Sequence, residues 1–281
     1  MKNFSKGLLI VFVLVIFFAI SRAMNLREYS SFFATILGTS TFIFGVFTTF
    51  SITDRRARID KIRENDSEER SQLLSLSLSS RQIGKEFHES VNKKIDEYLM
   101  ATLDFKIWDY HLTQKYYDDL FEKVLKFEPE SNKDKALFGN MISGMTKILS
   151  CRKSTIGLID DRLSNFEWLV SAFLSIVILA CLSALNSGSN ISFIVILFLS
   201  LALALLLSLL YSLDSLAWKE EERIFEPYEK TFETLGLERY YPEALIKQKR
   251  VTKHIGKKYR MGIISKPYPD MSEKRIKLIE K

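Results

Sequence analysis

The sequence predicts an all-α integral membrane protein with four transmembrane helices and both chain ends in the cytoplasm. Three uncharged apolar runs of about 20 residues each are long enough to cross the hydrocarbon core of a bilayer, and a shorter run from Gly7 to Ile20, extended to about Met24, makes a fourth span. The long segment between the second and third runs repeats its apolar residues at helical spacing. Basic residues gather at the ends of the runs that lie on one side of the membrane, which sets the orientation.

Residues 1–63 are predicted to form a transmembrane hairpin, with spans 7–24 and 31–52, that continues into a charged stalk. Two lysines precede the first apolar run, and this pattern also fits a cleavable signal peptide. We favour a retained span, because Ser21-Arg22-Ala23 is a poor cleavage site and another span follows within ten residues.

The second span is unusual because bulky and small side chains fall on opposite faces of the helix. When the span is projected as a helix, small or hydroxyl-bearing residues share one face with one aromatic ring. The candidate pore-lining residues on this face are Gly38, Thr41, Phe42, Gly45, Thr48, Thr49 and Ile52. Small residues allow close helix–helix packing in lipid, whereas hydroxyl groups and a Phe42 constriction would suit a pore. Both interpretations remain open, and they are compatible.

Residues 64–162 are predicted to be a cytoplasmic helical region. The block from Asp54 to Arg162 holds 20 basic and 20 acidic residues, a balance that argues against a nucleic-acid surface. The apolar spacing predicts one helix from about Ser80 to Phe127, ended by Glu128-Pro129. A second helix should start near Lys133 and run into the third span.

Residues 163–213 are predicted to form a second transmembrane hairpin, with spans 168–185 and 191–213, and the leucine-rich last span should face lipid. Cytoplasmic helices are expected over 214–243, where acidic residues exceed basic ones by five. The tail 244–281 carries twelve basic residues against three acidic ones. This basic tail either binds anionic lipid headgroups or is solvated or packed on a partner.

The charges around the spans predict where each chain end lies. Basic residues crowd the end of span two, the start of span three and the sequence after span four, so both termini should be cytoplasmic. Arg55, Arg56 and Asp214 would then lie at the inner mouth of a pore. Pairing of Asp214 with a neighbouring arginine is the alternative to a site at the mouth. The predicted location is the plasma (inner) membrane of a prokaryote.

The sequence contains no recognisable catalytic constellation. A glycine-rich phosphate loop, His-Glu-x-x-His, Cys-x-x-Cys and Gly-x-Ser-x-Gly are all absent from it. Two cysteines are too few for a disulfide framework, and the three histidines show no ligand spacing. We therefore predict no enzyme activity, no catalytic residues, no metal site and no cofactor.

Several short motifs carry a resemblance to a known family. Thr41-Phe42-Ile43-Phe44-Gly45-Val46-Phe47 resembles the second span of the bacterial bestrophin-like family of four-span proteins. Ile95-Asp96-Glu97-Tyr98-Leu99, Leu213-Asp214-Ser215-Leu216-Ala217-Trp218 and the pair Glu226-Pro227 with Tyr240-Tyr241-Pro242 are also similar to that family. The resemblance to bestrophins implies a pentamer with span two around the axis, a hydrophobic neck and a cytoplasmic vestibule. An acidic loop like the calcium clasp of the animal members is missing from this sequence.

The resulting functional hypothesis is an oligomeric ion channel that conducts anions through a pore lined by span two. The expected partners are membrane lipids, further copies of the chain, as in a pentamer, and inorganic anions, with no nucleic acid. Arginines at the inner mouth would raise the local anion concentration, although the membrane orientation alone also requires them. The alternative is a membrane-anchored scaffold or signalling protein that acts through its cytoplasmic helices.

Overall fold

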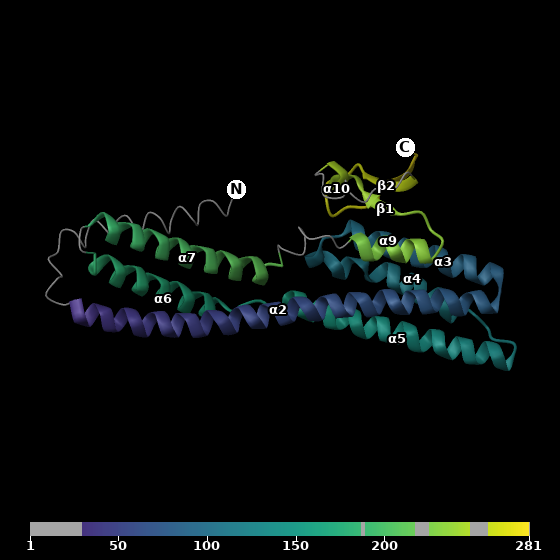
Figure 1. Ribbon diagram of the computed structural model, residues 1–281. Helices are drawn as coiled ribbons and strands as arrows, with labels where there is room; N and C mark the ends of the chain where they lie inside the picture. Colours follow the sequence, from purple (N-terminus) through teal and green to yellow (C-terminus); the bar gives the residue numbers. More distant parts are fainter. Residues whose placement is uncertain (1–29, 187–188, 217–224, 248–257, 281) are drawn as a thin grey trace. The chain divides into compact units, whose positions relative to one another are not determined.

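The computed structural model of the chain describes residues 30–186, 189–216, 225–247 and 258–280 (Figure 1). The predicted first span, 7–24, lies outside the described residues. The chain divides into two compact units, and helix α2 (Ser30–Ile83) contributes residues to both. Unit 1 comprises residues 1–57 and 162–215, and unit 2 comprises residues 58–161 and 216–281.

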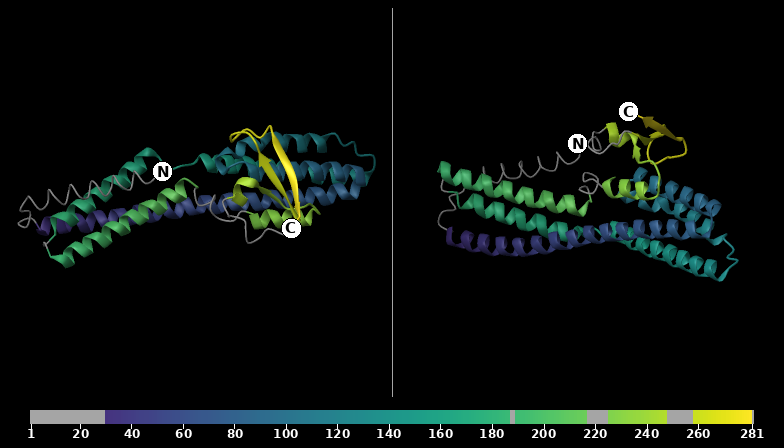
Figure 2. Two further views of the ribbon diagram at one scale, coloured as in Figure 1. Left: turned by 90° about the horizontal axis from the view of Figure 1, so that it is seen from above. Right: turned by 45° about the vertical axis from the view of Figure 1, so that its right-hand side comes forward.

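Unit 1 contains three helices that are long and apolar enough to cross a membrane. They are α2, α6 (Asn165–Ala184) and α7 (Asn190–Asp214), and they run side by side in the views of Figures 1 and 2. These helices confirm that three of the predicted apolar runs are helical. Phe44 of α2 is buried against Leu174, Ile178 and Leu182 of α6. Helix α7 exposes leucines along most of its length, as expected for a helix surrounded by lipid.

Unit 2 is built mainly from helices around one apolar core. After the end of α2 come α3 (Lys85–Asp104), the 3₁₀ helix η2 (Ile107–Thr113), α4 (Gln114–Leu125) and α5 (Asn132–Asp160). Val91, Ile95, Leu99 and Leu120 are buried in the core, in agreement with the helical spacing of the sequence. Helix α9 (Phe225–Thr234) adds Tyr228 and Phe232 to the same core.

The single helix predicted from Ser80 to Phe127 is wrong, because the chain is interrupted twice. Gly84 adopts an extended conformation between α2 and α3, and Phe105 is extended after α3. Glycine costs about 1 kcal/mol inside a helix relative to alanine, so Gly84 is a natural place for a break. The interruption at Phe105 allows α3 and α4 to pack against each other, which a continuous helix would forbid.

The predicted start of the following helix near Lys133 is confirmed, but its continuation into the third span is wrong. Ser131 caps α5 through a reciprocal capping box with Asp134. Helix α5 ends at Asp160, and α6 begins at Asn165. A second capping box, between Ser164 and Glu167, caps the start of α6. Each box satisfies backbone donors at a helix start, which makes a separate helix favourable.

The C-terminal residues form a small three-stranded sheet, so the chain is mostly rather than entirely helical. The order is β1 (Tyr240–Pro242), β2 (Lys258–Ile264) and β3 (Lys274–Glu280), with β1 parallel and β3 antiparallel to β2. The short helix α10 (Glu243–Lys247) follows β1. Tyr241 and Tyr259 are buried in a cluster beneath these elements. This sheet corrects the fold class predicted as all-α, and its strands β2 and β3 lie within the predicted basic tail.

Candidate functional site

One side of the membrane part of α2 packs inside unit 1. Ser40, Phe44, Thr48, Ser51 and Arg55 are buried and recur every three or four residues, which places them on one helix face. Thr48 is 3% exposed, and its hydroxyl group has no hydrogen-bond partner among the described residues. Thr48 therefore belongs to the packed side of α2 within the protomer.

The other candidate pore residues lie on the uncovered sides of α2. Gly38, Thr41, Phe42, Gly45 and Thr49 are exposed, and Ile52 is half-buried. Phe42 is 72% exposed, a large value for an aromatic ring in an apolar helix. Phe42, Val46 and Thr49 point away from the packed side. Phe42 and Thr49 thus lie on the face that the sequence projection selects, and they also point away from the packed side of α2.

A pocket of about 480 Å³ lies between α2 and the start of α6. Leu163 and Glu167 line it near α6, and the α2 residues that line it are Phe42, Ile43, Val46, Phe47, Phe50, Ser51 and Asp54. Its wall is mostly apolar, with carboxylates only from Asp54 and Glu167. The pocket can accept an apolar group within the membrane or at its surface.

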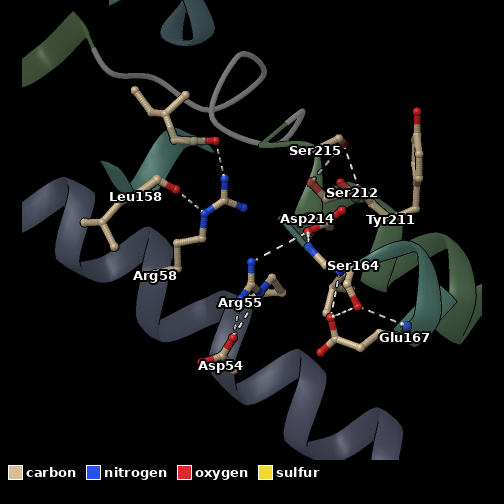
Figure 3. A network of polar contacts seen from close by, with 12 residues as sticks. Asp54, Arg55, Arg58, Leu158, Ser164, Glu167, Tyr211, Ser212, Asp214 and Ser215 are labelled. Atoms are coloured by element: carbon tan, nitrogen blue, oxygen red, sulfur yellow. Dashed lines mark hydrogen bonds and ion pairs between the residues drawn. The ribbon is translucent and has the colours of Figure 1, made fainter. Parts of the chain in front are cut away.

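At the end of the apolar run, Arg55 is held between two carboxylates (Figure 3). Its Nη2 lies 2.5 Å from Oδ2 of Asp54, and its Nη1 lies 3.7 Å from Oδ1 of Asp214. The same Asp214 oxygen accepts a hydrogen bond of 2.8 Å from the backbone N–H of Leu163. Asp214, the last residue of α7, therefore links the middle of α2 to the segment just before α6, in agreement with the pairing alternative.

The two arginines of the predicted inner mouth have different surroundings. Arg55 is buried with its charge compensated, so it adds little to the potential outside. Arg56, the next residue, is exposed. Of this pair, only Arg56 exposes its side chain.

Unit 2 contains a buried polar network that the sequence did not reveal. The Arg152 side chain is fully buried, and its Nη1 donates hydrogen bonds to Tyr98 Oη (2.5 Å) and Thr113 Oγ1 (2.9 Å). The hydroxyl groups of Tyr98 and Tyr110 donate to the carboxylate of Glu69. Glu69 and Arg152 occupy the apolar stripes of α2 and α5, and a charge within such a stripe is the signal that could have revealed them.

Burial changes the acid–base properties of this network. Desolvation raises the pKa of Glu69 above its usual range, although the two tyrosine hydroxyl groups and Arg152 lower it. Burial also raises the pKa of Tyr117 to about 12, so its hydroxyl stays protonated and donates to the carbonyl of Met145. The network is thus a rigid hydrogen-bonded centre of the unit.

Within unit 2, ion pairs join the basic tail to helix α3. Both Arg260 terminal nitrogens contact Asp96, at 2.5 and 2.7 Å. Lys274 Nζ lies 2.5 Å from Oδ2 of Asp104, which also accepts at Oδ1 a hydrogen bond of 2.6 Å from Tyr240. These contacts favour the partner-packed interpretation for Arg260 and Lys274, with the partner being α3 of the same chain.

The described residues contain no group of three or more His, Cys, Asp or Glu side chains that could hold a metal ion. A family model described as Bestrophin-like domain matches residues 7–216. The match covers about three quarters of the chain. No curated protein and no solved structure matches the chain.

Proposed function

Because the chain belongs to the bestrophin-like family, we propose that it forms an oligomeric ion channel that conducts anions. The observation that carries this proposal is the uncovered side of α2, where Phe42 and Thr49 are exposed on an apolar helix. A membrane helix that exposes threonine and glycine gains nothing from lipid, but it gains from water or from another helix.

In this proposal α2 lines the pore of a ring of identical chains. Phe42 forms a hydrophobic constriction that would limit ion flow by excluding water. Thr49, about two turns further along, offers its hydroxyl group to a partly dehydrated ion. Gly38 and Gly45 have no side chains, so they leave space beside the proposed ion path.

Charge at the inner mouth supports anions as the conducted ions. The exposed Arg56 would be repeated once per chain at the rim of the opening, where its positive charge attracts anions to the extent that a neighbouring carboxylate leaves it uncompensated. Arg55 instead serves the protomer, because Asp54 and Asp214 compensate it. The proposed orientation places unit 2 and both termini in the cytoplasm of a prokaryote.

The test is chloride flux into liposomes that contain the purified full-length protein, with its subunit number measured in detergent by mass photometry. We expect a ring of four or more subunits and a protein-dependent chloride flux. Phe42→Ala should raise this flux severalfold, because a wider constriction retains water. The matched control is Leu201→Ala, which truncates an exposed apolar side chain on α7 and should leave the flux unchanged.

A monomeric protein without flux would overturn the channel proposal. The cytoplasmic helices would then become the functional part, as in the scaffold hypothesis. Pull-down of a partner that is lost when residues 80–127 are deleted would support that alternative.

A further inference from the structure

The two flanks of α2, on either side of the face with Phe42 and Thr49, differ in shape and charge. We call the side with Gly38, Gly45 and Arg56 the glycine flank, and the side with Ile43, Phe50 and Asp54 the aromatic flank. Residues two positions apart on a helix point about 160° away from each other. Ile43 and Gly45 therefore lie on opposite flanks at similar depth, and so do Asp54 and Arg56.

The glycine flank is a shallow, open surface. A Cβ atom built on Gly38 or Gly45 would meet nothing within 4 Å. The two glycines are seven residues apart, which is close to two helical turns, so they lie on the same side. In a membrane, such a pair of small residues lets another helix backbone approach closely.

The aromatic flank has the opposite shape, because bulky side chains project beside a hollow. Phe50 is 72% exposed, and Ile43 is about half exposed. Both line the 480 Å³ pocket, together with Leu163 near the start of α6. This flank therefore presents projecting rings and a pocket to whatever lies next to it.

The charges at the ends of the flanks are complementary. Asp54 borders the pocket of the aromatic flank, and its side chain remains 65% exposed although it contacts Arg55. Arg56, on the glycine flank, is also exposed. The two residues differ in depth by only about 3 Å, at 1.5 Å of rise per residue.

We infer that the two flanks are the halves of one contact between neighbouring copies of this chain. The glycine flank of one copy packs against the aromatic flank of the next, and Arg56 of the first lies beside Asp54 of the second. A contact between two different patches generates a ring when the rotation closes. The inference rests on the oligomer of the proposed function and assigns Gly38 and Gly45 to the contact between subunits rather than to the pore wall.

Disulfide cross-linking in membranes tests this arrangement, with copper phenanthroline and oxygen as the oxidant. The full-length double variant Ile43→Cys with Gly45→Cys should give a ladder of covalent dimers, trimers and higher species, because each chain is joined to both neighbours. Each single variant should stay monomeric on the gel, because its one introduced cysteine meets no cysteine of the neighbouring copy across the contact. The wild type is the background control, since its Cys151 and Cys181 are buried.

A change of charge provides a second, independent measurement. Arg56→Asp alone should lower the fraction of rings measured by mass photometry, because its carboxylate would meet Asp54 of the neighbouring copy. The double variant Arg56→Asp with Asp54→Asn removes this repulsion, keeps an oxygen that accepts a hydrogen bond from Arg55, and should restore rings. The matched control is Lys61→Glu, an exposed charge reversal on the same helix that should not change the fraction.

These outcomes separate the interface from the channel. A wild-type monomer would overturn both the ring and this contact. Three outcomes would overturn only the contact inferred here, provided that the wild type forms a ring. They are a double cysteine variant that gives no ladder, a single cysteine variant that gives covalent dimers, and a double charge variant that does not restore rings.

Discussion

Arg55 and Arg56 are adjacent in sequence and carry the same charge, yet one helical step of about 100° separates their roles. Arg55 turns toward the packed side of α2 and pairs with Asp54 and Asp214. Arg56 turns outward. The sequence pattern grouped both at the inner mouth, because charge and position along the chain do not show which side of a helix is covered. That distinction required the contact with Asp214, which lies far from Arg55 in the chain.

Glu69 provides a test of the buried network through the pH dependence of stability. Its pKa is raised in the folded protein by burial, so the folded state binds this proton more tightly than the unfolded state. The free energy of unfolding should therefore fall as the pH rises from about 4.5 through the raised pKa. The loss should be about 1.4 kcal/mol for each tenfold difference in proton affinity between the two states. Glu69→Gln has no proton to lose and should flatten this dependence in thermal melts from mildly acidic to neutral pH.

The control for this measurement is Glu64→Gln, which removes an exposed carboxylate from the same helix. It should keep the wild-type slope. An equal slope for Glu69→Gln and the wild type would show that Glu69 does not change protonation in this range. The comparison uses slopes, so a uniform loss of stability from imperfect packing of the amide does not affect it.

At the level of helices and strands, the sequence predicted most of what depends on regular spacing. The apolar period identified the helical core positions, such as Val91 and Ile95, and the long uncharged runs identified α6 and α7. The breaks were missed, because Gly84 and the Ser164-Glu167 capping box are short local signals within long periodic segments. The strands β2 and β3 were missed because their many lysines and arginines were interpreted only as a charge excess.

Gly262 provides a test of the sheet. A Cβ atom at this position of β2 would lie 1.8 Å from Tyr240 Oη and 2.6 Å from its Cζ. Tyr240 is buried and bonded to Asp104, so its ring cannot move away without losing that hydrogen bond. Gly262→Ala should therefore destabilise the protein by about 1–3 kcal/mol, the usual range for overpacking, and increase hydrogen exchange in β1 and β2.

The matched substitution is Gly157→Ala in α5, where a Cβ atom would meet nothing within 4 Å. It should stabilise the protein by about 0.5–1 kcal/mol, because alanine loses less backbone entropy in a helix. Equal melting temperatures for the two variants would contradict the close packing of Tyr240 on Gly262.

At the scale of the whole molecule, the described apolar helices and the family both indicate a membrane protein. The orientation of the chain in the membrane is predicted from a different feature, the basic residues in the segments that connect the helices. The sequence could predict the number of apolar runs and the side on which arginines gather. It could not predict which surfaces of α2 meet another chain, because side-chain spacing alone does not distinguish a pore wall from a helix contact. The covered side of α2 within the protomer reduces that ambiguity, since it excludes Thr48 from the uncovered face.

Labelling with a membrane-impermeant maleimide tests the proposed orientation. Ser67→Cys on the exposed surface of α2 in unit 2 should be labelled only in inverted membrane vesicles. Asn190→Cys at the start of α7 should be labelled only from the outside of intact cells. The wild-type chain should remain unlabelled, because both native cysteines are buried. Labelling of both variants from the same side would contradict the proposed topology.

The strand β3 has a further consequence for the behaviour of the protein in solution. In the described part of the chain it pairs only with β2 and no strand lies along its other edge, and Ile276 and Leu278 are about half exposed on it. Such an edge can recruit a strand from another molecule and start aggregation. Arg275 and Lys277, both exposed, alternate with these apolar residues and repel an identical edge. The positive charge of β3 thereby opposes edge-to-edge association of copies at high protein concentration.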